Sequence, residues 1–133
     1  MDTVSKTKIK WRVRFIAWWF GIEIRFGKTP QEANIMINDP PPYDYIYFGD
    51  GIVFVRTTSK DCVSMMNIKI LHEIGHGILD FFGEEKDEMT EEHQANGAMF
   101  TLCALLRMPM PKSFERGSLN QKFREAIGHK NLH

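Results

Sequence analysis

The chain has 133 residues, enough for one domain that spans residues 1–133 and buries its own hydrophobic core. Its 17 basic and 17 acidic residues balance, so no overall field attracts nucleic acid or an anionic membrane, and we expect neither as a partner. The longest apolar run near the start, Phe15 to Phe20, is too short for a secretory signal, and nothing approaches a membrane span. Cys62 and Cys103 are too few for a disulfide framework, so we expect free, buried thiols in a soluble cytoplasmic protein.

Residues 9–20 carry two apolar periodicities at once. Apolar and basic residues alternate over the first half, which predicts a strand with one cationic face, whereas apolar residues at helical spacing followed by Gly21 predict a helix. Periodicity leaves both interpretations open. In either, we expect a solvated basic face over a Trp-rich core. The interleaved aromatic and basic residues from Lys8 to Arg14 would also suit a nucleic-acid strand, but no second basic patch supports that interpretation.

The front half of the chain is predicted to form a small sheet. Gly21 to Gly27 alternates apolar and polar residues between two glycines, which predicts a strand, and Ala33 to Ile37 is predicted as another. Three consecutive prolines, Pro40 to Pro42, then force an extended loop. Residues 45–48 and 52–55 flank a Gly-Asp-Gly sequence, whose Asp-Gly step tolerates the positive φ of a tight β-hairpin.

Two helices are predicted to follow the sheet. The polar stretch from Thr57 to Asp61 offers several N-caps for a helix that runs to about Phe82. An acidic loop precedes a second helix, which begins near Thr90 and ends before Pro109. Residues 113–127 are mixed in character and are expected to be helical in part. The apolar stripes that would pack the two helices on a core comprise Leu71, Ile74, Gly75, Ile78 and Phe82 in the first and Ala95, Ala98, Met99, Leu102, Leu105 and Leu106 in the second.

The first of these helices contains a His-Glu-x-x-His motif, His72-Glu73-Ile74-Gly75-His76. Residues four apart lie one above the other on a helix, so His72 and His76 present both imidazoles to one cation. Two imidazoles are half of a catalytic zinc site, which usually has three protein ligands and one position for water. The carboxylate of Glu73 is placed to take a proton from that water and to pass it to a leaving amine. The small residues Gly75 and Gly77 would allow another segment to approach closely.

A third ligand is expected from the first turn of the second helix, which offers Glu91, Glu92 and His93. Acidic residues are also favoured at helix N-termini by the helix dipole, so their presence alone does not indicate a site. Counting 100° per residue places both glutamates toward the edges of the buried stripe and points His93 away from it. Periodicity therefore favours a glutamate without deciding between Glu91 and Glu92.

Three stretches of the chain combine into a wider pattern. They are His72-Glu73-Ile74-Gly75-His76, Glu92-His93-Gln94-Ala95-Asn96 and Leu105-Leu106-Arg107-Met108-Pro109. The pattern resembles the ImmA/IrrE type of zinc peptidase domain, in which His-Glu-x-x-His is followed by a helix that carries Glu-x-x-Ala-Asn and ends in a Leu-Leu-x-Pro-like signature. The resemblance covers roughly Gly21 to Pro109. The chain departs from the family at Gln94, where another acid is common, and after Asn96, where an aromatic residue is usual.

This resemblance implies a zincin-like α+β fold, in which a small mixed or antiparallel sheet packs on the His-Glu-x-x-His helix and on a second, glutamate-bearing helix. It implies that His72, His76 and Glu92 bind Zn²⁺ and that Glu73 is the general base. It also implies that Asn96 lies behind the ligands, where a hydrogen bond to the second ring nitrogen of a ligand histidine would orient the ring.

The leading hypothesis is therefore a zinc-dependent metallopeptidase, and the resemblance implies a specific protein substrate such as a regulator or repressor. The alternative is a catalytically silent zincin-fold module that regulates a partner by binding it. The sequence leaves the substrate, the oligomeric state and the native divalent ion open. Candidates for stabilising the oxyanion of the reaction are Tyr43, Tyr45, Tyr47, His129 and His133.

Overall fold

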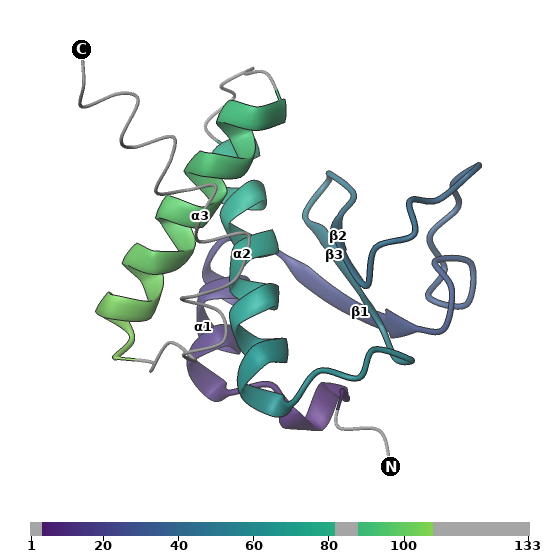
Figure 1. The fold of residues 1–133 in the computed structure, drawn as a ribbon, viewed down its shortest axis with the longest axis horizontal. Coiled ribbons are helices and arrows are strands. Elements are labelled where there is room, and N and C mark those ends of the chain that lie inside the picture. Colours follow the sequence, from purple (N-terminus) through teal and green to yellow (C-terminus); the bar gives the residue numbers. More distant parts are fainter. Residues whose placement is uncertain (1–3, 82–87, 108–133) are drawn as a thin grey trace.

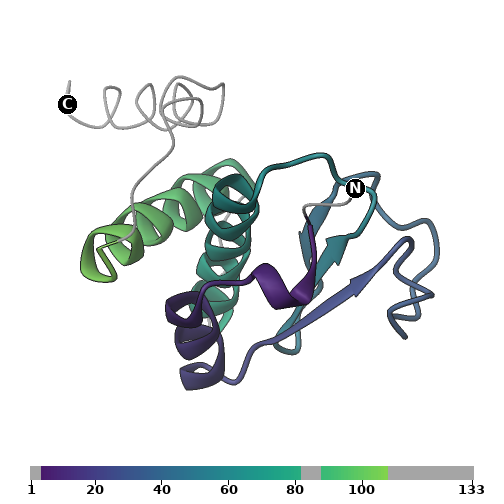
Figure 2. The ribbon, with the colours of Figure 1, turned by 90° about the horizontal axis from the view of Figure 1, so that it is seen from below.

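The computed structural model describes residues 4–81 and 88–107, which form a mixed α+β arrangement. A three-stranded sheet lies on one side of a long central helix, and two further α-helices lie on its opposite side (Figures 1 and 2). Within the described ranges, no helix combines the length and apolarity needed to span a bilayer. In chain order the elements are the 3₁₀ helix η1 (Lys6–Lys8), α1 (Trp11–Trp19), β1 (Glu23–Gly27), β2 (Tyr45–Tyr47), β3 (Ile52–Arg56), α2 (Val63–Phe81) and α3 (Glu88–Leu105).

The ambiguous segment near the start is a helix, α1. It buries Val13 and Ala17 in the core, and the backbone N–H of Lys10 donates a 2.8 Å hydrogen bond to the side chain of the fully buried Asn67 in α2. The predicted Trp-rich core is wrong. The three tryptophans are exposed because a helix turns 100° per residue, so a helix that buries positions 13 and 17 directs positions 11, 18 and 19 to the opposite side.

The sheet has the strand order β1-β3-β2. Strand β3 is central, since it pairs in parallel with β1 and antiparallel with β2. The predicted hairpin between β2 and β3 is confirmed, and its turn residues Gly49, Asp50 and Gly51 all have positive φ. Gly51 is further restricted because a β-carbon there would lie 2.8 Å from the carbonyl oxygen of Gly21. The strand expected at residues 21–27 is confirmed as β1.

The segment from Ala33 to Ile37 is not a strand, contrary to the prediction. Its alternation reflects burial without strand pairing, because Ala33 and Ile35 are buried in a small cluster with Ile46 and Phe54. Two backbone features prevent strand pairing in this segment. The N–H of Ala33 bonds within a tight turn to the carbonyl of Pro30, and Asn34 has a φ of 61°, a left-handed conformation that no strand tolerates.

Helix α2 is the centre of the core. It is buried on several sides because it contacts α1, α3, β2 and β3. Two glycines permit these contacts, as the sequence predicts. A β-carbon at Gly75 would lie 2.8 Å from the carbonyl oxygen of Ala95 in α3, and one at Gly77 would lie 2.7 Å from the Ile22 side chain. Backbones can approach this closely only where no side chain intervenes.

Helix α3 packs on α2 through a narrower stripe than predicted. Ala95, Met99 and Cys103 are buried, whereas Leu105, expected in the stripe, is 74% exposed near the end of the helix. Both cysteines are free, but Cys62 is exposed just before α2, which corrects the expectation that both thiols are buried. Phe82 and residues 113–127 lie outside the described residues, so the predictions for them stay predictions.

Candidate metal centre

Three side chains from two helices converge on one point. His72 and His76 come from successive turns of α2, and Glu92 comes from the first turns of α3. One potential ligand atom of each lies within 4.8 Å of the others. Nε2 of His72 is 3.1 Å from one carboxylate oxygen of Glu92, and Nε2 of His76 is 2.9 Å from the other. The two imidazoles and the carboxylate could together hold a metal ion.

The packing of α2 on α3 sets this geometry. The four-residue spacing brings the two imidazole centroids to 4.9 Å of each other. Gly75 lies between the histidines in sequence and lets the backbone of α3 approach at Ala95. Glu92 precedes Ala95 by three residues, about one helical turn, so its side chain lies on the same side of α3 as that contact. The close helix contact therefore carries the carboxylate to the histidines.

The electrostatics of the cluster favour an ionised carboxylate. The hydrogen bonds from His72 and then His76 hold the pKa of Glu92 well below its usual value of 4.5. The histidine side chains are 9% and 12% exposed, whereas that of Glu92 is 43% exposed. The centre is thus walled on the α2 side and more open at the carboxylate. A negative oxygen facing two imidazole nitrogens is also the arrangement that a bound cation would stabilise.

Asn96 lies one turn after Glu92 and is 3% exposed, as expected of a residue behind the ligands. The expectation is that Asn96 orients a ligand histidine through a hydrogen bond. At His72 this bond is not formed, since Nδ1 of His72 and Oδ1 of Asn96 are both buried and neither has a hydrogen-bond partner among the described residues. Buried polar atoms are usually paired, so these two atoms are an exception beside the candidate ligands.

Glu73 lies beside the cluster, half-buried on α2. Burial raises the pKa of its carboxyl, while the neighbouring His72 and His76 act in the opposite direction. The backbone N–H of Tyr47, in the edge strand β2, faces this carboxylate and also acts to lower its pKa. Sequence inspection does not identify that contact, because a backbone donor carries no signal in its residue type and its direction depends on the register of the strand.

The register of β2 explains why this N–H is free to reach α2. Ile46 is paired with Phe54 of β3, and the N–H of Phe48 bonds to the carbonyl of Ile52 on the same strand. Alternate residues of an antiparallel edge strand direct their backbone groups to opposite sides. Tyr45 and Tyr47 therefore direct their N–H and C=O groups away from β3, and Tyr47 meets Glu73.

The candidate oxyanion donors fall in different environments. The hydroxyl of Tyr47 donates a 2.9 Å hydrogen bond to Asp80 and accepts one from the N–H of Gly51, which fixes the ring beside α2. Tyr45 is buried with its ring 5.6 Å from the ammonium of Lys69, and Tyr43 is 65% exposed. Outside the described residues lie His129, His133 and the side chain of Glu91.

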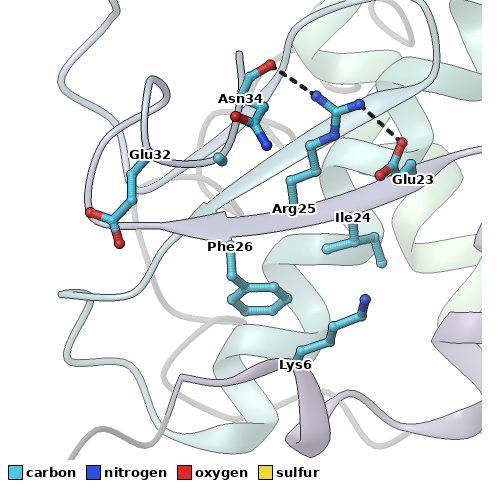
Figure 3. Close-up of a pocket in the computed structure, with 8 residues that line it drawn as sticks. Lys6, Glu23, Ile24, Arg25, Phe26, Glu32 and Asn34 are labelled. Atoms are coloured by element: carbon cyan, nitrogen blue, oxygen red, sulfur yellow. Dashed lines mark hydrogen bonds and ion pairs between the residues drawn. The ribbon is translucent and has the colours of Figure 1, made fainter.

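A cavity of about 400 Å³ lies elsewhere, beside β1 (Figure 3). Arg25, one of its charged lining residues, is already engaged, since the guanidinium donates 3.2 Å hydrogen bonds to the carbonyl of Asn34 and to the carboxylate of Glu23. None of the residues that line this cavity belongs to the histidine and glutamate cluster. The cluster and the cavity are separate features of the fold.

Comparison with protein-family models, with curated proteins and with solved structures finds no match to this chain. The chemistry of the centre is therefore inferred from its own donor atoms and their neighbours. Those donors, two imidazole nitrogens and a carboxylate oxygen, match the ligand types of a catalytic zinc site.

Proposed function

We propose that the protein is a zinc-dependent metallopeptidase with a zincin-like active site, related to the ImmA/IrrE type that its motifs resemble. In this proposal His72, His76 and Glu92 hold the ion and Glu73 is the general base. One observation carries the proposal: the three ligand atoms lie within 4.8 Å of one another, on two helices, with a fourth ionisable group beside them. A chance His-Glu-x-x-His sequence would have no reason to meet a carboxylate of the following helix at ligand distance.

Zinc fits the donor set better than the alternatives. Mg²⁺ and Ca²⁺ prefer all-oxygen sites, whereas two imidazoles and one carboxylate are a known three-ligand set for catalytic zinc. A zinc ion held there would act as a Lewis acid that polarises the scissile carbonyl and activates water near neutral pH. Iron and other divalent ions also accept nitrogen and oxygen ligands, so the identity of the metal is part of what the experiment below measures.

Glu73 supplies the proton transfers. Burial raises the pKa of its carboxyl, which makes the carboxylate a stronger base and, once protonated, a donor matched to a leaving amine. The N–H of Tyr47 faces one side of the carboxylate. This neighbouring donor favours one orientation of Glu73, so the carboxylate is oriented before substrate arrives.

Strand β2 offers a place for the substrate backbone. The Tyr47 N–H faces Glu73, but the N–H and C=O of Tyr45 and the C=O of Tyr47 also point outward from the sheet edge. An extended peptide that paired with this edge would run past Glu73 and the metal ligands, and main-chain hydrogen bonds would supply affinity without dictating sequence. Selectivity for one protein, such as the regulator or repressor that the resemblance implies, would then come from side-chain contacts outside the edge.

The rival function is a silent zincin-fold module that regulates a partner by contact. Its fold and even its metal could be the same. The observation against it is Glu73, whose carboxylate is kept beside the ligands although burial of a charge is costly there. A binding module would have no use for a buried base at this position.

The decisive experiment uses the full chain, purified without chelators. Elemental analysis is expected to find about one zinc per chain, and none after the His76→Ala substitution. Cleavage of an internally quenched peptide library is expected to fall about 100-fold or more in Glu73→Gln, with the zinc content unchanged.

A metal-free wild-type chain, or a Glu73→Gln variant that cleaves as fast as wild type, would overturn the proposal. If the wild-type chain binds zinc but neither it nor the variant cleaves any member of the library, the silent module is the better description. Asp61→Asn, a change of another partly buried carboxylate that lies before α2, is a matched control and should leave both readouts unchanged.

A further inference from the structure

Helix α1 has two apolar faces. One face contains Val13 and Ala17 and is buried against the core. The opposite face contains Trp11, Phe15, Trp18 and Trp19, whose exposed fractions are 68%, 46%, 73% and 66%. We call these four residues the aromatic face. Helices that are apolar all round are normally covered on all sides, but no such cover exists for this face among residues 4–81 and 88–107.

The aromatic face is a continuous surface. The rings of Phe15 and Trp18 are 6.2 Å apart between centroids, those of Phe15 and Trp19 are 6.1 Å apart, and those of Trp18 and Trp19 are 6.5 Å apart. Trp11 continues it one turn earlier, with the guanidinium of Arg12 5.0 Å from its ring. At 100° per residue, Arg12 and Arg14 fall on the two borders of the face, and the guanidinium of Arg14 donates hydrogen bonds to the carbonyls of Ile9 and Lys6.

The charge of this segment differs sharply from that of the whole chain. Residues 4–22 contain five basic residues and no acidic one, although the complete sequence is neutral. The expectation that no membrane is a partner follows from the overall balance and does not account for this local excess. Any surface that covers the aromatic face must therefore tolerate or prefer positive charge around it.

We propose that the aromatic face of α1 docks on an anionic lipid bilayer and holds the protein at a membrane surface without crossing it. Tryptophan rings favour the boundary between headgroups and acyl chains, and flanking arginines reach anionic phosphates while their stems cover apolar surface. Each basic residue close to an anionic leaflet adds to the attraction. Arg12 and Arg14 border the face and Lys8 is exposed in the preceding helix η1, whereas Lys6 lines the cavity beside β1.

Two other possible binding partners of the aromatic face fit less well. A second copy of the chain would bring one segment of five cations against another, which is unfavourable when no acid in either segment offsets them. Single-stranded nucleic acid stacks on open aromatic ring faces, whereas these rings lie against one another at tilts of 36° to 66°. The bilayer matches both the apolar surface and the charge, and the proposal is independent of the metal centre.

The test measures binding of the full chain to lipid vesicles by flotation. Vesicles of phosphatidylcholine alone are compared with vesicles that also contain about 30% phosphatidylglycerol, at low and at high salt. All three tryptophans of the chain lie on the aromatic face, so their emission reports directly on its environment. We expect binding to the anionic vesicles, a blue shift of the emission, and loss of most binding at high salt.

Paired variants identify the surface. Phe15→Ala keeps all three tryptophans and is expected to lower partitioning about tenfold, whereas Tyr43→Ala, at a similarly exposed aromatic residue elsewhere, should not change it. Lys8→Glu is expected to lower partitioning about fivefold or more, whereas Lys28→Glu should leave it near wild type. All four residues lie at least partly in solvent, and circular dichroism checks that each variant is folded.

Failure of the wild-type chain to float with anionic vesicles at low salt would overturn the proposal. Binding that is equal in Phe15→Ala and wild type would overturn it as well. The same follows if the chain binds a single-stranded oligonucleotide but not vesicles, or if it forms a dimer that Phe15→Ala dissociates, since each result assigns the face to another occupant.

Discussion

The carboxylate of Glu92 bridges the two histidines, one oxygen to each imidazole. This places both carboxylate oxygens and both Nε2 atoms around a common centre, and it depresses the pKa of Glu92 through hydrogen bonds whose donors a cation would replace. The neighbouring Glu91 is the other carboxylate that helix periodicity allows at this position. Substituting each glutamate in turn shows which one is the ligand, whereas their spacing in the sequence does not.

Glu92→Gln is therefore expected to weaken zinc binding by more than about 100-fold, because an amide replaces a charged ligand. Glu91→Gln removes the same charge from the same helical turn and is expected to leave the affinity within about threefold. Competition with a fluorescent zinc chelator measures both. If the Glu91 variant loses the metal and the Glu92 variant retains it, the assignment of the third ligand is wrong.

The buried Cys103 provides a second test at the residue scale. Burial raises the pKa of its thiol from 9.0 to about 11. A thiol that stays protonated in the folded chain but ionises in the unfolded chain contributes stability that is fully present below pH 9. That stability is lost as the pH rises from about 9 toward 11.

The wild-type free energy of unfolding should thus fall by up to about 2 kcal/mol more than that of Cys103→Ala between pH 8 and pH 11. Urea denaturation at each pH measures the difference. Cys62, which is exposed, supplies the control, since Cys62→Ala should follow the wild-type pH dependence. Parallel curves for the wild type and Cys103→Ala would show that the buried thiol does not titrate differently in the folded state.

At the scale of elements, the contact between α2 and α3 is made by backbone as much as by side chains. The carbonyl oxygen of Ala95 occupies the space that a side chain at Gly75 would need. The same contact positions Glu92, so the stability of the fold and the geometry of the candidate metal site depend on one helix separation. The edge of β2 has a comparable role on the other side of α2, where the N–H of Tyr47 reaches Glu73.

Gly75→Ala is expected to destabilise the fold by about 1–3 kcal/mol, because a β-carbon 2.8 Å from a backbone oxygen forces the helices apart. Helix propensity alone predicts the opposite sign, a gain of about 0.5–1 kcal/mol. Zinc affinity should fall together with stability as Glu92 is displaced. Ser64→Ala, at an exposed position of the same helix, is the control and should be neutral or slightly stabilising in thermal and urea denaturation. A stable Gly75→Ala variant with normal zinc affinity would contradict this account of the contact.

At the scale of the whole molecule, the candidate metal centre joins two consecutive helices, α2 and α3, so a bound metal would be coupled to folding. Zinc at about 100 times its dissociation constant should stabilise the chain by about 2.7 kcal/mol, if the unfolded chain does not bind it. For a domain of this size we expect the melting temperature to rise by roughly 5–15 °C. Calorimetry with and without a chelator measures the shift.

His76→Ala is the control for that measurement, because it removes one ligand while its melting temperature in chelator can be measured separately. Its melting temperature should not respond to zinc. An equal rise in the variant and the wild type would assign the stabilisation to sites other than the cluster of His72, His76 and Glu92.

Local interactions explain which features the sequence alone determines. The histidine pair needs only the repeat of one helix, and the hairpin needs only a turn sequence that accepts positive φ, so residues within a few positions suffice for both. The sequence also predicts the small separation between α2 and α3, because a glycine inside a helix costs stability and Gly75 is explained by a close contact with another segment. The α+β composition is also predictable from the sequence, because helices and strands each have their own periodicity of apolar residues.

Tertiary structure decided the rest because those choices depend on partners far along the chain. The segment before Gly21 suits a strand or a helix, and docking on α2 through Asn67 selects the helix and exposes the tryptophans. The alternation from Ala33 to Ile37 suits a strand, but the turn at Pro30 and the positive φ of Asn34 prevent pairing, so the segment forms a loop that buries only Ala33 and Ile35. The N–H of Tyr47 reaches Glu73 through strand register, which residue types do not encode. Burial and strand pairing depend on contacts between residues far apart in the sequence, so they are determined only when the chain folds.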